Sequence, residues 1–366
     1  MRGPILVLGK YEIIEPIASG GMATVYHARV AGPMGFEKPV AVKVLLDEAA
    51  EDEDIVRMFI DEARLGARLS HPNIASVLDF GEVSGRYFLA MEYVDGVSLS
   101  TLRKRLSRGK KISPMEPDMA LYVTDQVLRG LSYAHTLRGE DGKALSLVHR
   151  DVSPQNILLD KSGAVKLCDF GIATGAYRTE KTRSGLVKGK AGYMSPEQAS
   201  AGRVDARSDQ YSLGLTLVAM LSGATPFVGK DTHEVRVRAE KGIDRSRIDE
   251  LDVNDALKEV LVKAMSLKPA DRFKDTEALS RAMEEAAAGS GEAGRRALAK
   301  VLQKVAREKK KKAEGVKKAK KAGSATAGSR ELEPGSLKGL RNLLIVVGAI
   351  ALIATILALL GVGPEG

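Results

Sequence analysis

Three oxygen-bearing side chains follow one another closely in the middle of the chain. "VHRDVSPQN" (residues 148–156) contains Asp151 and Asn156, and "LCDFG" places Asp169 thirteen residues after that asparagine. Carboxylate and amide oxygens are hard donors, which suit Mg²⁺ and the phosphates that it accompanies. Phosphoryl transfer asks a protein for positioning and for positive charge around the phosphates, with little covalent chemistry. Residue types of this kind therefore suit phosphate chemistry.

A lysine nearer the N-terminus could supply part of that positive charge, and a nearby glutamate could hold the lysine in place. "VAVK" (residues 40–43) alternates as a strand does and ends in Lys43. In "IVRMFIDEARLGARL", Glu62 falls four residues after Met58 and seven after Ile55, on the inward stripe of a predicted helix. A carboxylate on that face is costly unless a cation meets it, so we predict an ion pair between Lys43 and Glu62.

Taken in order, these motifs resemble those of the eukaryotic-like serine/threonine protein kinases of bacteria, over residues 11–273. The resemblance implies an α+β protein kinase fold, with a strand-rich small lobe to about Val94, a helical large lobe, and Mg-ATP between them. It also implies transfer of the ATP γ-phosphate to serine or threonine of protein substrates. "GYMSPE" (residues 192–197) favours that class over tyrosine.

The resemblance assigns roles to individual residues. Asp151 is the expected catalytic base, Asn156 and Asp169 are the expected ligands of Mg²⁺ or Mn²⁺, and Lys43, held by Glu62, is expected to contact the α- and β-phosphates. "MEYVDG" (residues 91–96) resembles the hinge, where backbone groups of Glu92 to Val94 would bind adenine. The expected glycine-rich loop comprises Ile17, Ala18, Ser19, Gly20, Gly21, Met22, Ala23, Thr24 and Val25, with alanine at 18 and 23 in place of the outer glycines.

Two further departures concern the charge around the γ-phosphate. Ser153 stands where the family has a lysine, and Lys190 stands where it has a threonine beside that lysine in space. We hypothesise that the two positions have exchanged character, so that Lys190 provides the cation and Ser153 makes room for it. The alternative is that both changes weaken activity.

The resemblance also predicts supporting and regulatory contacts. Glu197 and Arg272 are expected to pair, His149 is expected to pack rather than to act chemically, and Cys168 is expected to be a small buried residue beside the nucleotide. Arg150 would bind a phosphate on the activation loop. The candidate sites of autophosphorylation are Thr179, Thr182 and Ser184.

Composition divides the chain of 366 residues into three parts. We predict a kinase domain over residues 11–285, a Lys- and Ala-rich linker over 286–338, and a transmembrane helix over 342–363. Residues 286–341 carry 16 Lys or Arg against 5 Asp or Glu, so the net charge of +9 belongs to one segment. An apolar stripe at Leu298, Val301, Leu302 and Val305 indicates either a solvated, partly helical spacer or a helix attracted to anionic lipid.

Residues 343–362 contain no charge or strongly polar group and are long enough to cross a bilayer. Lys and Arg residues lie on the N-terminal side of this segment. By the positive-inside rule they predict a single-pass protein of the bacterial inner membrane with its kinase domain in the cytoplasm. Small residues in the span could permit self-association, which would allow phosphorylation in trans.

Two rival functions remain open at this stage. One is a membrane-tethered pseudokinase that binds nucleotide and recruits partners; the complete set of Lys43, Glu62, Asp151, Asn156 and Asp169 disfavours it. The other is nucleic-acid binding through the lysine runs, which the absence of interleaved aromatic residues and the adjacent apolar span disfavour. We therefore expect protein substrates and an anionic membrane surface as partners, and no nucleic acid.

Overall fold

The computed structural model describes residues 7–107, 112–170, 191–287 and 291–326, with side chains of the last helix described as far as residue 308. The chain forms two compact units, Met1–Arg307 and Glu308–Gly366. The predicted transmembrane segment, Lys190 and the candidate phosphorylation sites lie outside the described residues. Among the helices that are described, none is both long and apolar enough to cross a membrane.

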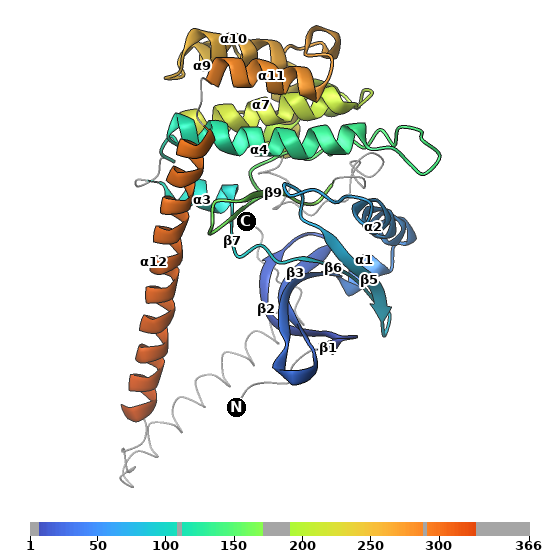
Figure 1. Ribbon diagram of the computed structural model, residues 1–366, viewed down its shortest axis with the longest axis vertical. Helices are drawn as coiled ribbons and strands as arrows, with labels where there is room; N and C mark the ends of the chain where they lie inside the picture. The colour runs from blue at the N-terminus through green and yellow to red at the C-terminus, as the bar shows by residue number, and fades with distance from the viewer. Residues whose placement is uncertain (1–6, 108–111, 171–190, 288–290, 327–366) are drawn as a thin grey trace, which may run out of the picture. The chain divides into compact units, whose positions relative to one another are not determined.

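The first part of the larger unit is a six-stranded antiparallel sheet with the strand order β1-β2-β3-β4-β6-β5 (Figure 1). Valine, alanine and aromatic residues such as Val42, Phe88 and Ala90 are buried on one face, while Leu45 and Leu89 pack with Phe59 of α2. Its elements are β1 (Val7–Leu8), β2 (Tyr11–Ser19), β3 (Ala23–Ala31), η1 (Pro33–Gly35), β4 (Glu37–Leu45), α1 (Asp47–Ala50), α2 (Glu53–Gly66), β5 (Val77–Val83) and β6 (Arg86–Glu92).

A helical lobe follows, with a small sheet of order β7-β8-β9 at its edge (Figure 1). This arrangement is the predicted two-lobed α+β fold. The elements are β7 (Gly96–Ser98), α3 (Leu99–Arg105), α4 (Pro117–Thr136), β8 (Ile157–Asp160), β9 (Val165–Leu167), η3 (Ala191–Tyr193), α6 (Pro196–Ala199), α7 (Ala206–Ser222), α8 (Thr232–Glu240), α9 (Ser246–Asp249), α10 (Asp255–Ala264), η4 (Pro269–Asp271), α11 (Thr276–Ala287) and α12 (Gly291–Thr326).

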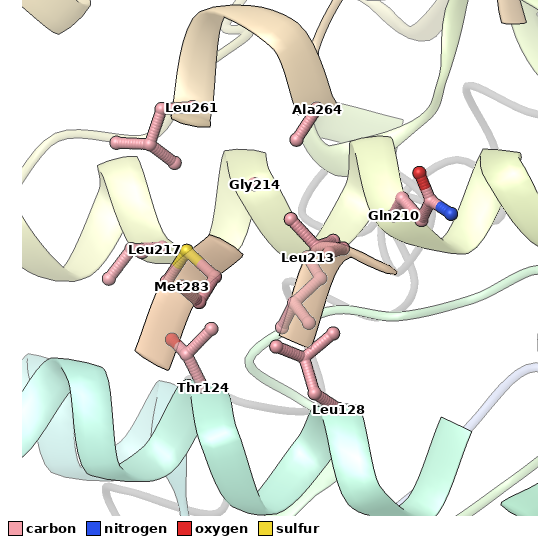
Figure 2. Close-up of a pocket in the computed structure, with 10 residues that line it drawn as sticks. Thr124, Leu128, Gln210, Leu213, Gly214, Leu217, Leu261, Ala264 and Met283 are labelled. Atoms are coloured by element: carbon pink, nitrogen blue, oxygen red, sulfur yellow. The ribbon is translucent and has the colours of Figure 1, made fainter. Parts of the chain in front are cut away.

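Helix α7 is the centre of this lobe and is buried on all sides from Ser208 to Leu221. It starts at a capping box between Asp205 and Ser208, and it ends at Gly223, whose φ of 74° lies in the left-handed region that glycine adopts without strain. Figure 2 shows the cavity among α4, α7, α10 and α11, of about 10 Å³. Such a volume is of the order of one water molecule, so no ligand site exists at this place.

The start of α12 corrects the predicted domain boundary. Leu298, Leu302 and Val305 are 0%, 2% and 7% exposed and belong to the core of the helical lobe. The predicted stripe is therefore helical, but it faces protein, and neither a solvated spacer nor a lipid-facing helix describes it. These three aliphatic side chains, with no aromatic residue among them, are part of the core. The compact unit therefore continues to Arg307.

The predicted pair of Glu197 and Arg272 is present and buried. The guanidinium donates from Nη1 and Nη2 to the two carboxylate oxygens at 2.7 and 2.8 Å, and the side chains are 9% and 0% exposed. Burial alone would raise the pKa of Glu197, but hydrogen bonds from Arg272 and Ser208 lower it below its ordinary 4.5. This stabilisation is therefore present above about pH 4.5 and is lost as the pH falls through the folded pKa.

We predict that Arg272→Met lowers the free energy of unfolding by about 3–5 kcal/mol, because Glu197 keeps a buried charge without its partner. The matched control is Arg281→Met, which breaks the exposed pair with Glu277 and is expected to cost about 0–1 kcal/mol. Urea unfolding at pH 7 measures both variants. Equal losses in the two would contradict the account of this pair.

Candidate active site

Lys43 lies between two carboxylates from separate parts of the chain. Its Nζ donates to Glu62 Oε1 at 2.6 Å and to Asp169 Oδ1 at 3.1 Å. The lysine and glutamate side chains are 10% and 9% exposed, whereas Asp169 is 35% exposed. The ion pair predicted from the helical pattern is thus present, and Asp169 joins it from the direction of the helical lobe.

The electrostatics of this group keep the lysine charged. Burial by itself would lower the pKa of Lys43, but attraction to Asp169 and Glu62, together with hydrogen bonds to both, raises it above the ordinary 10.5. A raised folded pKa means that the contribution to stability is full below pH 10.5 and disappears only as the pH rises through the folded value. Lys43 is therefore a fixed cation throughout the physiological range.

Local structure explains why the two partners meet. Lys43 stands on β4, opposite Val25 of β3 and Leu89 of β6, so both neighbouring strands fix its position. Glu62 lies on α2, which begins at an N-cap where Asp52 accepts from two backbone N–H groups. Seven residues separate Glu62 from Ile55, which is two helical turns, and both lie on the side of α2 that packs on the sheet.

The loop that carries Asp151 and Asn156 is internally cross-linked. Asn156 Nδ2 donates to the backbone oxygen and to Oδ2 of Asp151, both at 2.9 Å. Because this nitrogen contacts Asp151, the amide oxygen is the atom of Asn156 that can ligate a cation. Cys168 N donates to Asn156 O at 2.9 Å, so the residue before Asp169 is tied to the loop.

Asp209 at the start of α7 anchors the same loop. Its carboxylate accepts from the backbone N–H groups of His149 and Arg150, both at 2.8 Å, and from His135 Nε2 at 2.8 Å. Arg150 has a φ of 65°, a left-handed conformation that is costly for a side chain other than glycine. The buried carboxylate offsets that cost. Sequence reasoning missed this role of Asp209, because the residues that it contacts lie about 60 positions away in the sequence.

His149 packs as expected. It is fully buried, its Nδ1 accepts from Asp151 N at 3.2 Å, and its Nε2 lies 3.0 Å from Cys168 O. Burial lowers the pKa of His149, so the neutral ring predominates at pH 7. Cys168 differs from expectation, because it is half-buried and its thiol lies 3.6 Å from Asp169 Oδ2.

The predicted nucleotide contacts fall on the sheet and on the segment after β6. The predicted glycine-rich loop, Ile17 to Val25, covers the end of β2, residues 20–22 and the start of β3, and Gly20 N donates to Ala23 O at 2.8 Å. Glu92 N donates to Ser76 O, and Val94 O accepts from Gly96 N. Some backbone groups of the predicted hinge thus already have partners within the chain.

The site suits a metal that shares its coordination with phosphate. No group of three or more His, Cys, Asp or Glu side chains that could hold a metal occurs within the described ranges. Asn156 and Asp169 supply two hard oxygen donors, which fits Mg²⁺, since this ion commonly keeps waters and substrate phosphates as its other ligands.

Ser153 is enclosed in the loop. It is 0% exposed, and its Oγ is buried without a hydrogen-bond partner in the part of the chain that the structure describes. Lys190, its hypothetical counterpart, lies outside that part, so the exchange of the two positions stays a prediction.

The fold and this site define a protein kinase. The family model described as "Protein kinase domain" matches residues 11–283, and the chain belongs to that family. It is 39% identical over 288 residues to the tyrosine-protein kinase MasK of Myxococcus xanthus, covering 77% of this chain and 44% of MasK. It is 33% identical to the serine/threonine-protein kinase PrkC of Bacillus subtilis, covering 74% and 39%.

A solved structure agrees with these relatives. The crystal structure of the Mycobacterium tuberculosis PknI kinase domain matches with a TM-score of 0.56 and 31% sequence identity, covering 77% of this chain and 97% of that one. The chain spans less than half the length of MasK and PrkC. The comparisons thus show a bacterial protein kinase domain of the serine/threonine type.

We predict that Glu62→Gln lowers kcat/KM for ATP at least about tenfold, because Lys43 loses the carboxylate that fixes its position. Asp61→Asn is the matched control, since Asp61 is on the same helix and makes only an exposed contact with Arg64 at 3.7 Å. Initial rates at varied ATP concentration measure both. A Glu62→Gln variant with wild-type kcat/KM would contradict the role of the ion pair.

Proposed function

We propose that the chain is a serine/threonine protein kinase that transfers the γ-phosphate of ATP to protein substrates in signalling. The observation that carries this proposal is the contact of the buried Lys43 ammonium with both Glu62 and Asp169. This contact connects the sheet, α2 and the loop after β9. Active kinases require this arrangement. The serine/threonine-protein kinase PrkC supports the same conclusion by its similarity.

Each residue then has a defined task. Lys43 binds the α- and β-phosphates and is held by Glu62. Asp151 orients the substrate hydroxyl and accepts its proton, as the hydroxyl oxygen bonds to the γ-phosphorus and the bond from that phosphorus to the β-phosphate oxygen breaks. Asn156 fixes the Asp151 carboxylate through its amide N–H. Asn156 and Asp169 would hold Mg²⁺, which would supply positive charge to the phosphates when bound.

Lys190 is the proposed second cation. The enclosed position of Ser153 supports the part of the hypothesis that needs a small residue there. A lysine at 190 would then compensate for the serine at 153 during transfer.

The substrate hydroxyl is the point on which the relatives differ, because MasK is named as a tyrosine-protein kinase. Serine and threonine follow from the similarity to PrkC and from the "GYMSPE" segment. Hydrolysis of the labelled product to free phosphoamino acids separates the two classes directly.

The test compares wild type, Asp151→Asn and Lys190→Met for incorporation of radiolabelled phosphate from ATP. We predict that Asp151→Asn loses at least about a hundredfold in rate, since the proton acceptor is removed. Lys190→Met should lose at least about tenfold in the same rate.

Mass spectrometry should find phosphate at Thr179, Thr182 or Ser184 in wild type. Inactive wild type that still binds ATP would favour the pseudokinase scaffold, and Lys190→Met within a few-fold of wild type would remove the exchange hypothesis.

We further propose that residues 342–363 anchor the enzyme in the bacterial inner membrane, with the kinase domain in the cytoplasm. The apolar span and its basic flank support this, and anionic lipid is the expected partner of the lysine runs. Self-association through the span would permit autophosphorylation in trans.

Fractionation of expressing bacteria tests the anchor. The full chain should remain in the membrane pellet after alkaline carbonate washing, and a chain ending at residue 341 should be released. Release of the full chain by the same wash would rule the anchor out.

A further inference from the structure

Hairpin β8–β9 carries the two proposed metal ligands at its ends. Asn156 immediately precedes β8, and Asp169 follows β9 by two residues. The strands pair in register from Ile157 opposite Leu167 to Leu159 opposite Val165. Because the hairpin joins the two ligands, its position in the lobe helps to set the separation of their oxygen atoms.

The turn of this hairpin is held by α4 and α12. Gly163, at the turn, has a φ of 90°, and a Cβ added there would lie 3.1 Å from Arg295 O and 3.4 Å from Ala299 Cβ. The backbone of α12 therefore lies directly against the turn. From α4, Tyr122 Oη donates to Gly163 O at 3.1 Å.

A second close approach fixes α12 itself. A Cβ added to Gly294 would lie 2.2 Å from Asp118 O and 2.6 Å from Tyr122 Cβ, so only glycine allows α12 to approach α4 this closely. Leu298 and Leu302 then enter the core of the lobe. Figure 1 shows the start of α12 beside α4. The first turns of α12, α4 and the hairpin turn thus form one packed group.

Open space adjoins one side of the turn. A surface pocket of about 390 Å³ is lined there by Ser162 and Ala164 of the turn and by Arg129 and Arg295. The contacts from Tyr122 and α12 act at the turn, whereas β7 and Asn73 hold the strands of the hairpin.

We propose that residues 291–307 of α12 are a positioning element of the kinase site: with Tyr122 they hold the hairpin turn, and thereby hold Asn156 and Asp169 at the spacing that Mg²⁺ needs. The inference rests on the proposed function, which makes these two residues metal ligands. The family model ends at residue 283, so the positioning element lies beyond the matched domain. Groups that orient metal ligands from behind commonly change metal affinity tenfold or more when lost.

The test compares Leu302→Asp with Gln303→Asp in the full chain. The two variants gain the same charge at neighbouring positions of α12, but Leu302 is 2% exposed and Gln303 is exposed. Hydrogen exchange followed by mass spectrometry reports on residues 157–167 and 291–307. Calorimetric titration with a non-hydrolysable ATP analogue at varied Mg²⁺ gives the Mg²⁺ concentration for half-maximal binding.

For Leu302→Asp we expect faster exchange in both segments and a Mg²⁺ requirement raised about three- to tenfold. Gln303→Asp should stay within twofold of wild type in both measurements. Faster exchange in residues 291–307 without a change in the Mg²⁺ requirement would overturn the positioning role. Failure of wild type to bind the analogue with Mg²⁺ would instead overturn the proposed function.

Tyr122→Phe provides a variant that keeps the packing and removes one hydrogen bond, from Oη to Gly163 O. We expect faster exchange in residues 157–167, a Mg²⁺ requirement raised about two- to fivefold, and unchanged exchange in residues 291–307. If Leu302→Asp does not fold, Tyr122→Phe is the variant that tests whether the hold on the hairpin turn sets the Mg²⁺ requirement. Wild-type exchange and Mg²⁺ requirement in Tyr122→Phe would overturn the role of the turn.

Discussion

A buried ammonium between two carboxylates is the constraint on which the arrangement of the site depends. Taking Lys43 out of water is unfavourable, and the charge is tolerated because Glu62 and Asp169 both contact it. The three residues come from β4, α2 and the loop after β9, which are far apart in the sequence. The sheet register, the rotation of α2 and the path of the chain after β9 must therefore all be correct before the charge is compensated.

The helical lobe supplies a buried carboxylate, Asp209, which acts on the backbone. Asp209 accepts from two consecutive N–H groups of the catalytic loop and holds Arg150 at a positive φ. Asp169 also has a positive φ, of 55°. Unfavourable backbone conformations thus occur both in the catalytic loop and at a proposed metal ligand, and hydrogen bonds and ion pairs compensate for them. Helix α7, which carries Asp209, is buried on every side and so places this carboxylate within the core of the lobe.

Sequence reasoning succeeded where a local pattern had one physical solution. The inward position of Glu62 required a cation, and Lys43 was available on the adjacent predicted strand. The order of the motifs was sufficient for the two-lobed fold. It failed where the deciding contact is distant: Asp209 lies about 60 residues from the loop that it anchors, and no local pattern shows this. Likewise, the Lys-, Ala- and Gly-rich composition of residues 286–338, without aromatic residues, predicted a linker, whereas residues 291–307 pack on the lobe through Gly294 and Leu298, and composition does not show such a contact.

The charge state of Lys43 is the most direct test of the central electrostatic claim. Titration of the full chain, with lysines labelled at Cε and followed by NMR, gives the pKa of each resolved lysine, and Lys43→Arg identifies the signal. The account predicts that Lys43 titrates above the ordinary value of 10.5, because two carboxylates outweigh the effect of burial. A Lys43 signal that titrates below 10.5 would contradict it.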